Sequence, residues 1–232
     1  MSNLNPVEAQ FSALRQRMVG QVASLVSLVA DKTGKDMLCN AVMSTLSKVP
    51  RHEFVPTEMK LYAYLDSPLP IGHGKTISQP FIVGLMTDLL ELNSSHKVLE
   101  IGTGLGYQAA VLAELANEVY TVETVQELAE ESERGLGIHG YDNIKFRVGD
   151  GNHGWPEQAP FDRIIATAAP ELIPPALLQQ IKPGGRMILP AGLKDAQQLL
   201  LIEKSNAGRI TTQEILPVRF SSFASPSYLP YR

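Results

Sequence analysis

The N-terminal third of the chain has apolar residues at helical spacing, separated by turn-forming and proline-rich segments. Over residues 6–30 an apolar side chain recurs every three or four positions, which predicts a long helix with one buried face. A stop and turn at 31–34 and a second helix over about 36–48 follow. The prolines of 49–56 argue against regular structure, and a short helix is expected over 57–65.

From residue 97 onward, short apolar strands alternate with helices. Alternation of this kind predicts a largely parallel sheet with helices on both faces. Helices are expected from residue 81, after Gly106, over 125–133 before glycines 135, 137 and 140, and over 174–181. Strands are expected at 98–101, 118–122, 144–148, 161–167 and 186–190, with a closing antiparallel hairpin at 197–204 and 210–220.

The fold class is therefore α/β: a Rossmann-like, doubly wound, mostly parallel sheet with an N-terminal helical extension. We divide the chain into N-terminal helices with an active-site loop (1–80), a core that binds the ligand (81–220) and an irregular tail (221–232), which has no apolar periodicity.

The composition predicts a soluble protein that does not bind nucleic acid. The chain of 232 residues is 44% apolar and 19% charged, and its net charge is -4, whereas nucleic-acid binders carry basic patches. The apolar run 22–30 is interrupted by serines and is too short to span a bilayer, so no membrane association is expected and we predict a cytoplasmic protein. The single cysteine, Cys39, excludes an internal disulfide, and its apolar helical surroundings favour a buried structural thiol.

A glycine-rich turn follows the first strand of the core. Gly102, Gly104 and Gly106 stand between that strand and a helix, the arrangement that opens a nucleotide-binding α/β unit. The spacing is G-x-G-x-G, not the G-x-G-x-x-G of most dinucleotide folds, which suggests a ligand without a pyrophosphate. Such turns also occur for purely structural reasons.

Acidic residues stand at the ends of three successive strands: Glu100, Glu123 and Asp150. Because the carboxyl ends of parallel strands form the ligand crevice, these acids suit a ligand with hydroxyls, an amino group and positive charge. S-adenosylmethionine meets this description. Glu123 has two interpretations, a ribose-binding carboxylate or an acid at the N-terminus of the next helix. The five histidines are scattered, so no metal site is predicted.

The proline-rich loop 66–80 ends at Ser78 and Gln79, directly before Pro80 and a predicted helix. Serine or glutamine ahead of a proline at the first helical position is an ordinary capping arrangement. Judged on its residues alone, the loop favours capping over catalysis for Ser78.

Several motifs carry a family resemblance. Residues 98–107, Val-Leu-Glu-Ile-Gly-Thr-Gly-Leu-Gly-Tyr, resemble the first motif of class I methyltransferases. The chain is more specifically similar to the protein-L-isoaspartate O-methyltransferase family, over about residues 36–220 and in motifs outside the shared cofactor fold. These motifs are 49–56 (Val-Pro-Arg-His-Glu-Phe-Val-Pro), 66–72, Thr-Ile-Ser-Gln-Pro at 76–80, Gly-Asp-Gly at 149–151 with Gly-Trp-Pro at 154–156, and 181–186.

The resemblance implies an enzyme that moves a methyl group from S-adenosylmethionine to the free carboxylate of L-isoaspartyl residues, leaving S-adenosylhomocysteine. Its partners would be damaged proteins and peptides. Ser78 would orient the substrate carboxylate, which replaces the capping interpretation as the favoured one. Implied substrate-binding residues are Thr76, Ile77, Thr167 and Ala168; implied cofactor-binding residues are Gln79, Glu100, Gly102, Thr103, Gly104, Gly106, Glu123, Asp150 and Gly151.

Three features depart from the family pattern. Lys75 stands where the family commonly has Gln or Ala, residues 221–225 lack the usual continuation, and the N-terminal helical segment is longer than expected. Two other functions therefore stay open: a small-molecule methyltransferase of the same fold, and a cofactor-binding homologue without catalysis. The oligomeric state is open as well.

Overall fold

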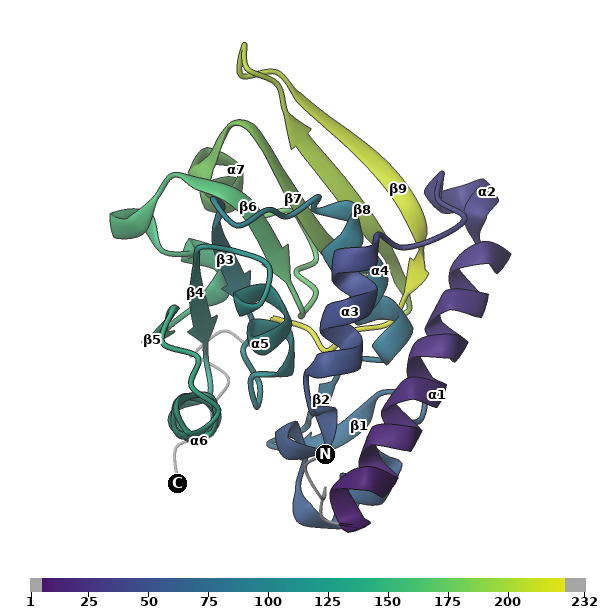
Figure 1. The fold of residues 1–232 in the computed structure, drawn as a ribbon. Helices are drawn as coiled ribbons and strands as arrows, with labels where there is room; N and C mark the ends of the chain where they lie inside the picture. The colour runs from purple at the N-terminus through teal and green to yellow at the C-terminus, as the bar shows by residue number, and fades with distance from the viewer. Residues whose placement is uncertain (1–5, 224–232) are drawn as a thin grey trace.

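The computed structural model describes residues 6–223. A seven-stranded sheet, in the order β5-β4-β3-β6-β7-β8-β9, forms the centre of the fold (Figure 1). The first five strands in that order run parallel, and β8 and β9 are added antiparallel, so the predicted mostly parallel sheet with its closing hairpin is confirmed. The strands are β3 (Lys97–Ile101), β4 (Glu118–Glu123), β5 (Ile144–Val148), β6 (Phe161–Ala166), β7 (Ile181–Leu193), β8 (Ala196–Lys204) and β9 (Ile210–Val218).

Helices cover both faces of this sheet. On one face Val98 and Ile165 belong to an apolar core shared with the N-terminal helices, α4 and α5. On the other face Leu99 and Ile164 pack in a second core with Leu177 of α7. Alternate residues of one strand thus enter opposite cores, as strand geometry requires. The helices of the sheet region are α4 (Pro80–Leu89), α5 (Tyr107–Ala113), α6 (Gln126–Ile138) and α7 (Pro175–Gln180).

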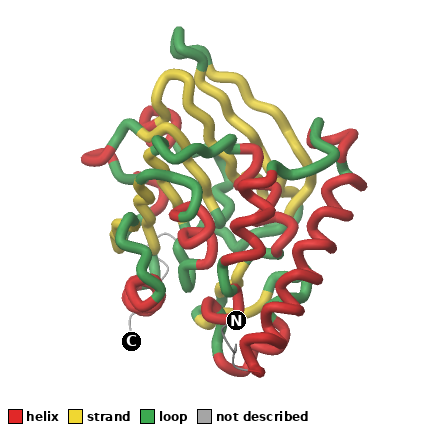
Figure 2. The backbone as a smooth tube through the Cα atoms, in the orientation of Figure 1, coloured by secondary structure: helices red, strands yellow, loops and turns green. Residues whose placement is uncertain are grey.

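The N-terminal helical extension packs against α4. It contains α1 (Pro6–Leu28), α2 (Ala30–Thr33), α3 (Asn40–Lys48) and two 3-10 turns, Arg51–Phe54 and Thr57–Tyr62. Met18 and Val22 on the predicted apolar face of α1 are fully buried, which confirms that face. The tube drawing in Figure 2 shows these helices gathered on one side of the strands. No helix within residues 6–223 is long and apolar enough to cross a membrane.

The loop 66–80 is more regular than expected, because it contains a two-stranded hairpin of β1 (Leu69–Gly72) and β2 (Lys75–Ile77). His73 and Gly74 form its turn with positive φ angles of 50° and 66°, the conformation that two-residue hairpins favour. Leu69 and Ile77 are paired across the hairpin and both are buried. The prolines concealed this alternation of buried and exposed positions in the sequence.

Several local predictions were wrong. A short helix, α2, replaces much of the expected turn at 31–34. α6 continues past Gly135 and Gly137 to Ile138, because both glycines keep helical φ angles and the fully buried Leu136 between them anchors the helix.

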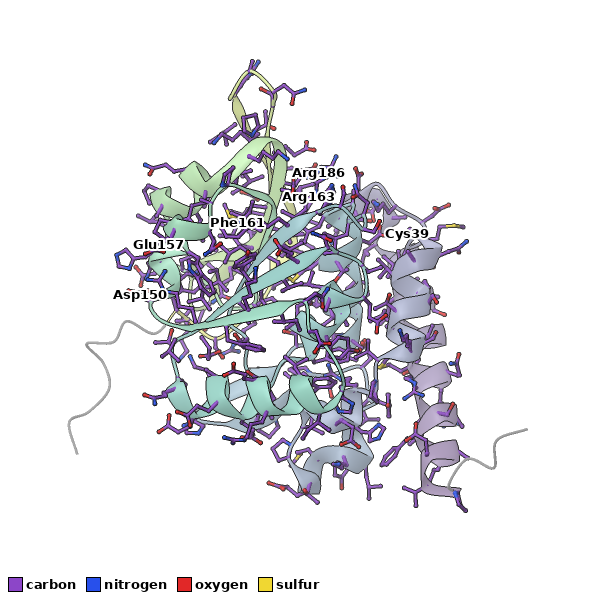
Figure 3. The ribbon with its side chains drawn as sticks, turned by 60° about the vertical axis from the view of Figure 1, so that its left-hand side comes forward. Cys39, Asp150, Glu157, Phe161, Arg163 and Arg186 are labelled. Carbon is purple, nitrogen blue, oxygen red and sulfur yellow. The ribbon has the colours of Figure 1, made fainter. Side chains whose placement is uncertain are left out.

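Cys39 and the tail also differ from expectation. Cys39 is exposed rather than buried, since it precedes α3 instead of lying inside an apolar helix; Figure 3 shows it beside the N-terminal helices, far across the view from Asp150. In the predicted irregular tail, Ser222 forms a parallel bridge with Ala169. Positions 224–232 of that tail lie outside the described residues.

Candidate active site

Three connected recesses open where the parallel strands end. The strand-end cleft, bounded by the glycine turn, the end of β4 and the β1–β2 hairpin, encloses about 550 Å³ with its mouth included. The apolar groove, between α4, α1 and the end of β9, encloses about 1300 Å³ on the same basis. A smaller inner recess lies between the glycine turn and the hairpin. Thr76 and Thr167 line all three, so the recesses meet at this pair.

The glycine turn brings backbone directly to the strand-end cleft. Gly102 and Gly104 line it with φ angles of 97° and 56°, which residues other than glycine rarely adopt. A Cβ on Gly102 would lie 2.6 Å from Oγ1 of Thr167, whose hydroxyl donates to the Gly102 carbonyl. The predicted cofactor residue Gly106 does not line this cleft. A Cβ there would meet Leu136 of α6 at 2.7 Å, so glycine at this position allows α6 to pack against the turn.

Glu123 fits both of its sequence interpretations. It lines the cleft at the end of β4, as a ribose-binding carboxylate should. Its carboxylate also accepts hydrogen bonds from the backbone N–H groups of Gly104 (2.9 Å), Thr124 (2.8 Å) and Val125 (3.0 Å). Through these bonds one buried acid ties the glycine turn to the start of α6, which is a stabilising placement for negative charge.

Glu100 lies behind the turn and not in the cleft. Its side chain is fully buried and does not line any of the three recesses. Burial raises its pKa to about 8, although a hydrogen bond from the Thr121 hydroxyl works in the opposite direction. The Thr103 hydroxyl is 2.6 Å from that of Thr121, so Glu100, Thr121 and Thr103 form one buried chain under the turn. Thr103 reaches only the inner recess.

Of the two neighbouring residues Asp150 and Gly151, which were both expected at the cofactor, only Gly151 lines the cleft. Gly151 lines the strand-end cleft, where a Cβ would lie 2.4 Å from Ile101 Cγ2. The Asp150 carboxylate instead accepts from the backbone and side-chain nitrogens of Asn152 and caps the following 3-10 turn. It is not among the groups that line the cleft.

Ser78 does not cap α4. The N-cap of α4 is Gln79, which makes no side-chain capping bond. Asp66 takes that role from the other end of the loop, since its carboxylate accepts from the Phe81 backbone N–H (2.8 Å) and from the Gln79 amide (2.7 Å). The Ser78 hydroxyl has no hydrogen-bond partner among residues 6–223, and Ser78 lines both the apolar groove and the inner recess. A serine that is held in place but unpaired is available to a ligand.

The remaining predicted residues occupy different recesses. Ala168, expected at the substrate, lines the strand-end cleft. Gln79, expected at the cofactor, lines the apolar groove, and Ile77 lines the inner recess. Lys75 lines the strand-end cleft rather than the groove. No group of three His, Cys, Asp or Glu side chains within the described part of the chain is placed to hold a metal ion.

Sequence reasoning missed two lining segments. Residues 221–223 close one side of the strand-end cleft, and residues 216–220 line the groove together with Leu25 of α1. The family resemblance, which extends to about residue 220, was the one signal present for the second segment. Nothing local could reveal the first, because its position depends on a contact with Ala169, more than fifty residues earlier in the chain.

Comparison with known proteins identifies the family. The sequence profile of the protein-L-isoaspartate(D-aspartate) O-methyltransferase family matches residues 24–227. The chain is 55% identical, over 92% of its length, to protein-L-isoaspartate O-methyltransferase 1 of Polaromonas sp. strain JS666, of which it covers 91%. This chain belongs to the protein-L-isoaspartate O-methyltransferase family. It is likewise 52% identical to protein-L-isoaspartate O-methyltransferase 2 of Syntrophobacter fumaroxidans, over 90% of this chain and 85% of that protein.

Solved structures of methyltransferases of this name share the fold. A crystallised protein-L-isoaspartate O-methyltransferase superposes with a TM-score of 0.74 at 29% identity, covering 88% of this chain and 66% of that one. A Plasmodium falciparum protein described as a putative protein-L-isoaspartate O-methyltransferase, in complex with S-adenosyl-L-homocysteine, has a TM-score of 0.72 at 24% identity, over 87% of this chain and 97% of that one.

The strand-end cleft fits the methyl donor of this methyltransferase family. Three glycines, Gly102, Gly104 and Gly151, border the cleft with bare backbone, and a Cβ at each would lie 3.0 Å or less from a neighbouring side chain. The Glu123 carboxylate is an acceptor suited to ribose hydroxyls, and Ile101 and Val122 offer an apolar surface to a flat base.

Proposed function

We propose that this protein transfers a methyl group from S-adenosylmethionine to the free carboxylate of L-isoaspartyl residues in damaged proteins and peptides. The observation that carries the proposal is the junction at Thr76 and Thr167, where a cleft suited to the donor meets a larger groove suited to a peptide. Ser78, whose hydroxyl has no hydrogen-bond partner within residues 6–223, lines the groove that meets the cleft there.

The reaction requires positioning more than acid–base catalysis. A free α-carboxyl group has a pKa of roughly 3.5 and is therefore an ionised nucleophile at neutral pH. S-adenosylmethionine, when bound, supplies an electrophilic methyl group on a sulfonium. The residues at the junction hold the carboxylate in line with that methyl group and exclude water, an effect of orientation. In the resulting methyl ester the leaving group is methoxide rather than the oxide of a carboxylate. The following backbone nitrogen can therefore attack the ester carbonyl and close a succinimide with loss of methanol, without further help from the enzyme.

We assign the roles by location. Ser78 donates its hydroxyl hydrogen to the substrate carboxylate, and Thr76 with Thr167 shapes the passage between donor and acceptor. In the strand-end cleft, Gly102 and Gly104 give the donor close backbone contact. In the same cleft Glu123 accepts hydrogen bonds from the ribose hydroxyls of the donor, and Gly151 faces the adenine of the donor.

We also propose a cytoplasmic protein that acts on damaged cellular proteins. The sequence contains one cysteine and so lacks an internal disulfide, in line with a reducing compartment.

A paired peptide assay tests the function. The purified protein is incubated with S-adenosylmethionine carrying a tritiated methyl group and either an isoaspartyl peptide or its aspartyl twin. We expect base-labile label in the isoaspartyl peptide alone. Equal label in both peptides, or none in either, would reject the proposal. Label in a metabolite extract with unlabelled peptides would indicate a small-molecule methyltransferase instead.

A further inference from the structure

The C-terminal strap, residues 221–223, forms a wall of the strand-end cleft although it lies far from the glycine turn in sequence. Its backbone is held in place: the Ala169 N–H donates to the Ser221 carbonyl at 2.8 Å, and the Phe223 N–H donates to the Ala169 carbonyl at 2.9 Å. Just before the strap, the buried Gln197 amide bonds both backbone groups of Phe220. The strap is therefore a defined part of the wall.

The Phe223 ring lies over Gly151. A Cβ built on Gly151 would be 3.5 Å from Cε2 and 3.7 Å from Cζ of this ring, and 2.4 Å from Ile101 Cγ2. The ring also packs against the apolar core that contains Ile101. One edge of the cleft is thus a wall in which bare backbone, an aliphatic side chain and an aromatic ring pack against one another.

Such a wall suits a flat, uncharged heteroaromatic group that packs against it from the cleft. Aromatic rings pack well against nucleobases, since both offer large apolar faces. Phe223 contributes the one aromatic side chain among the described residues that line this cleft. The carboxylate of Glu123 lines the same cleft, so a nucleoside with its base against the wall can reach that acid through its sugar.

We propose that Phe223 forms one face of the adenine site, as a positioning residue for the methyl donor. The proposal rests on the function proposed above, because it presumes that the cleft binds S-adenosylmethionine. It assigns a role to the segment where this sequence departs from the family pattern, Ser221 to Ser225, within its described part. The donor is then held between two parts of the chain that are distant in sequence.

Calorimetric titration of the full-length protein with S-adenosylhomocysteine tests the role of Phe223. We expect Phe223→Ala to raise the Kd about tenfold and Phe223→Leu to give an intermediate value, since stacking against a base contributes roughly 1–3 kcal/mol. The Kd of 5′-methylthioadenosine should rise by the same factor, because this compound keeps the adenine and lacks the amino-acid portion. The matched control is Tyr62→Ala, which removes an exposed ring that lines none of the three recesses and should leave both Kd values unchanged.

Three results would overturn this role: unchanged S-adenosylhomocysteine affinity in Phe223→Ala, full affinity in Phe223→Leu, or a loss for S-adenosylhomocysteine that methylthioadenosine does not share. If the unaltered protein binds S-adenosylhomocysteine and methylates the isoaspartyl peptide while Phe223→Ala binds normally, only the inference about Phe223 fails. If the unaltered protein binds neither compound, the proposed function fails with it.

Discussion

The strand-end cleft is bordered by three glycines, Gly102, Gly104 and Gly151, whereas no glycine of the described chain lines the apolar groove beside it. In the cleft, positive φ angles and buried hydrogen bonds define the position of each atom at the glycine turn. In the groove, which is more than twice as large, the walls come from α1, α4 and the end of β9. The difference matches the two ligands of the proposed reaction, a constant cofactor and a peptide whose sequence varies.

The largest effect is expected from a methyl group in the glycine turn. Gly102→Ala places a Cβ 2.6 Å from the Thr167 hydroxyl at a φ of 97°, which should lower the free energy of unfolding by about 2 kcal/mol. The Kd for S-adenosylhomocysteine should rise by about 100-fold, by calorimetry, because backbone and threonine both move into the cleft.

Gly137→Ala is the control for this change. Gly137 lies in α6 with helical φ and open space around it, so alanine should stabilise the protein by about 0.5–1 kcal/mol. Cofactor affinity should not change. Normal cofactor binding by Gly102→Ala would contradict the contrast between a rigid cleft and an adaptable groove.

Ser78→Ala should impair catalysis without weakening cofactor binding. We expect kcat to fall roughly 30-fold, as for loss of one oriented hydrogen bond to a reacting group, with the S-adenosylhomocysteine Kd within about twofold of its original value. Ser78 lines the groove and the inner recess but not the cleft. Steady-state kinetics on the isoaspartyl peptide and calorimetry supply the two readouts. A large loss of cofactor affinity would show that Ser78 supports the turn instead of the substrate.

Glu100→Gln should alter the pH dependence of stability. The pKa of Glu100 is raised from 4.5 to about 8, so the folded protein retains a proton that the unfolded chain releases. The stabilisation is complete below about pH 4.5 and is lost as the pH rises through about 8, with a slope of at most about 1.4 kcal/mol per pH unit. Urea unfolding at pH 5, 6, 7 and 8 should show this decline in the original protein and a flatter curve in the variant. If stability declined with pH equally in the original protein and in the variant, Glu100 would not be the group that holds the extra proton.

Lys75→Gln should have the smallest effect. Lys75 lines the cleft, and two like charges near each other in water interact by only about 1 kcal/mol. If its ammonium opposes the sulfonium, the variant should bind S-adenosylmethionine about threefold more tightly. S-adenosylhomocysteine, which has no sulfonium charge, serves as the matched control and should bind unchanged. An equal change for both compounds would exclude charge repulsion as the cause.

The sequence by itself determined the parts of this protein that depend on local periodicity and on backbone chemistry. Alternating strands and helices predicted the parallel sheet, and the spacing of Gly102 and Gly104 predicted the turn at its carboxyl edge. Strand ends predicted that Glu123 and Gly151 lie in the crevice at the carboxyl edge of the sheet, and both line the strand-end cleft there. The motif resemblance identified the family.

Only the tertiary structure decided which of these groups line the recesses. Glu100 is turned into the core, Gly106 packs on α6, and Asp66 replaces Ser78 as the cap of α4. The strap with Phe223 joins the cleft through Ala169. Each outcome depends on a contact between residues far apart in the chain, whose packing is set by the whole core. Local periodicity carries no information about such contacts, since it reports only which side of an element is apolar.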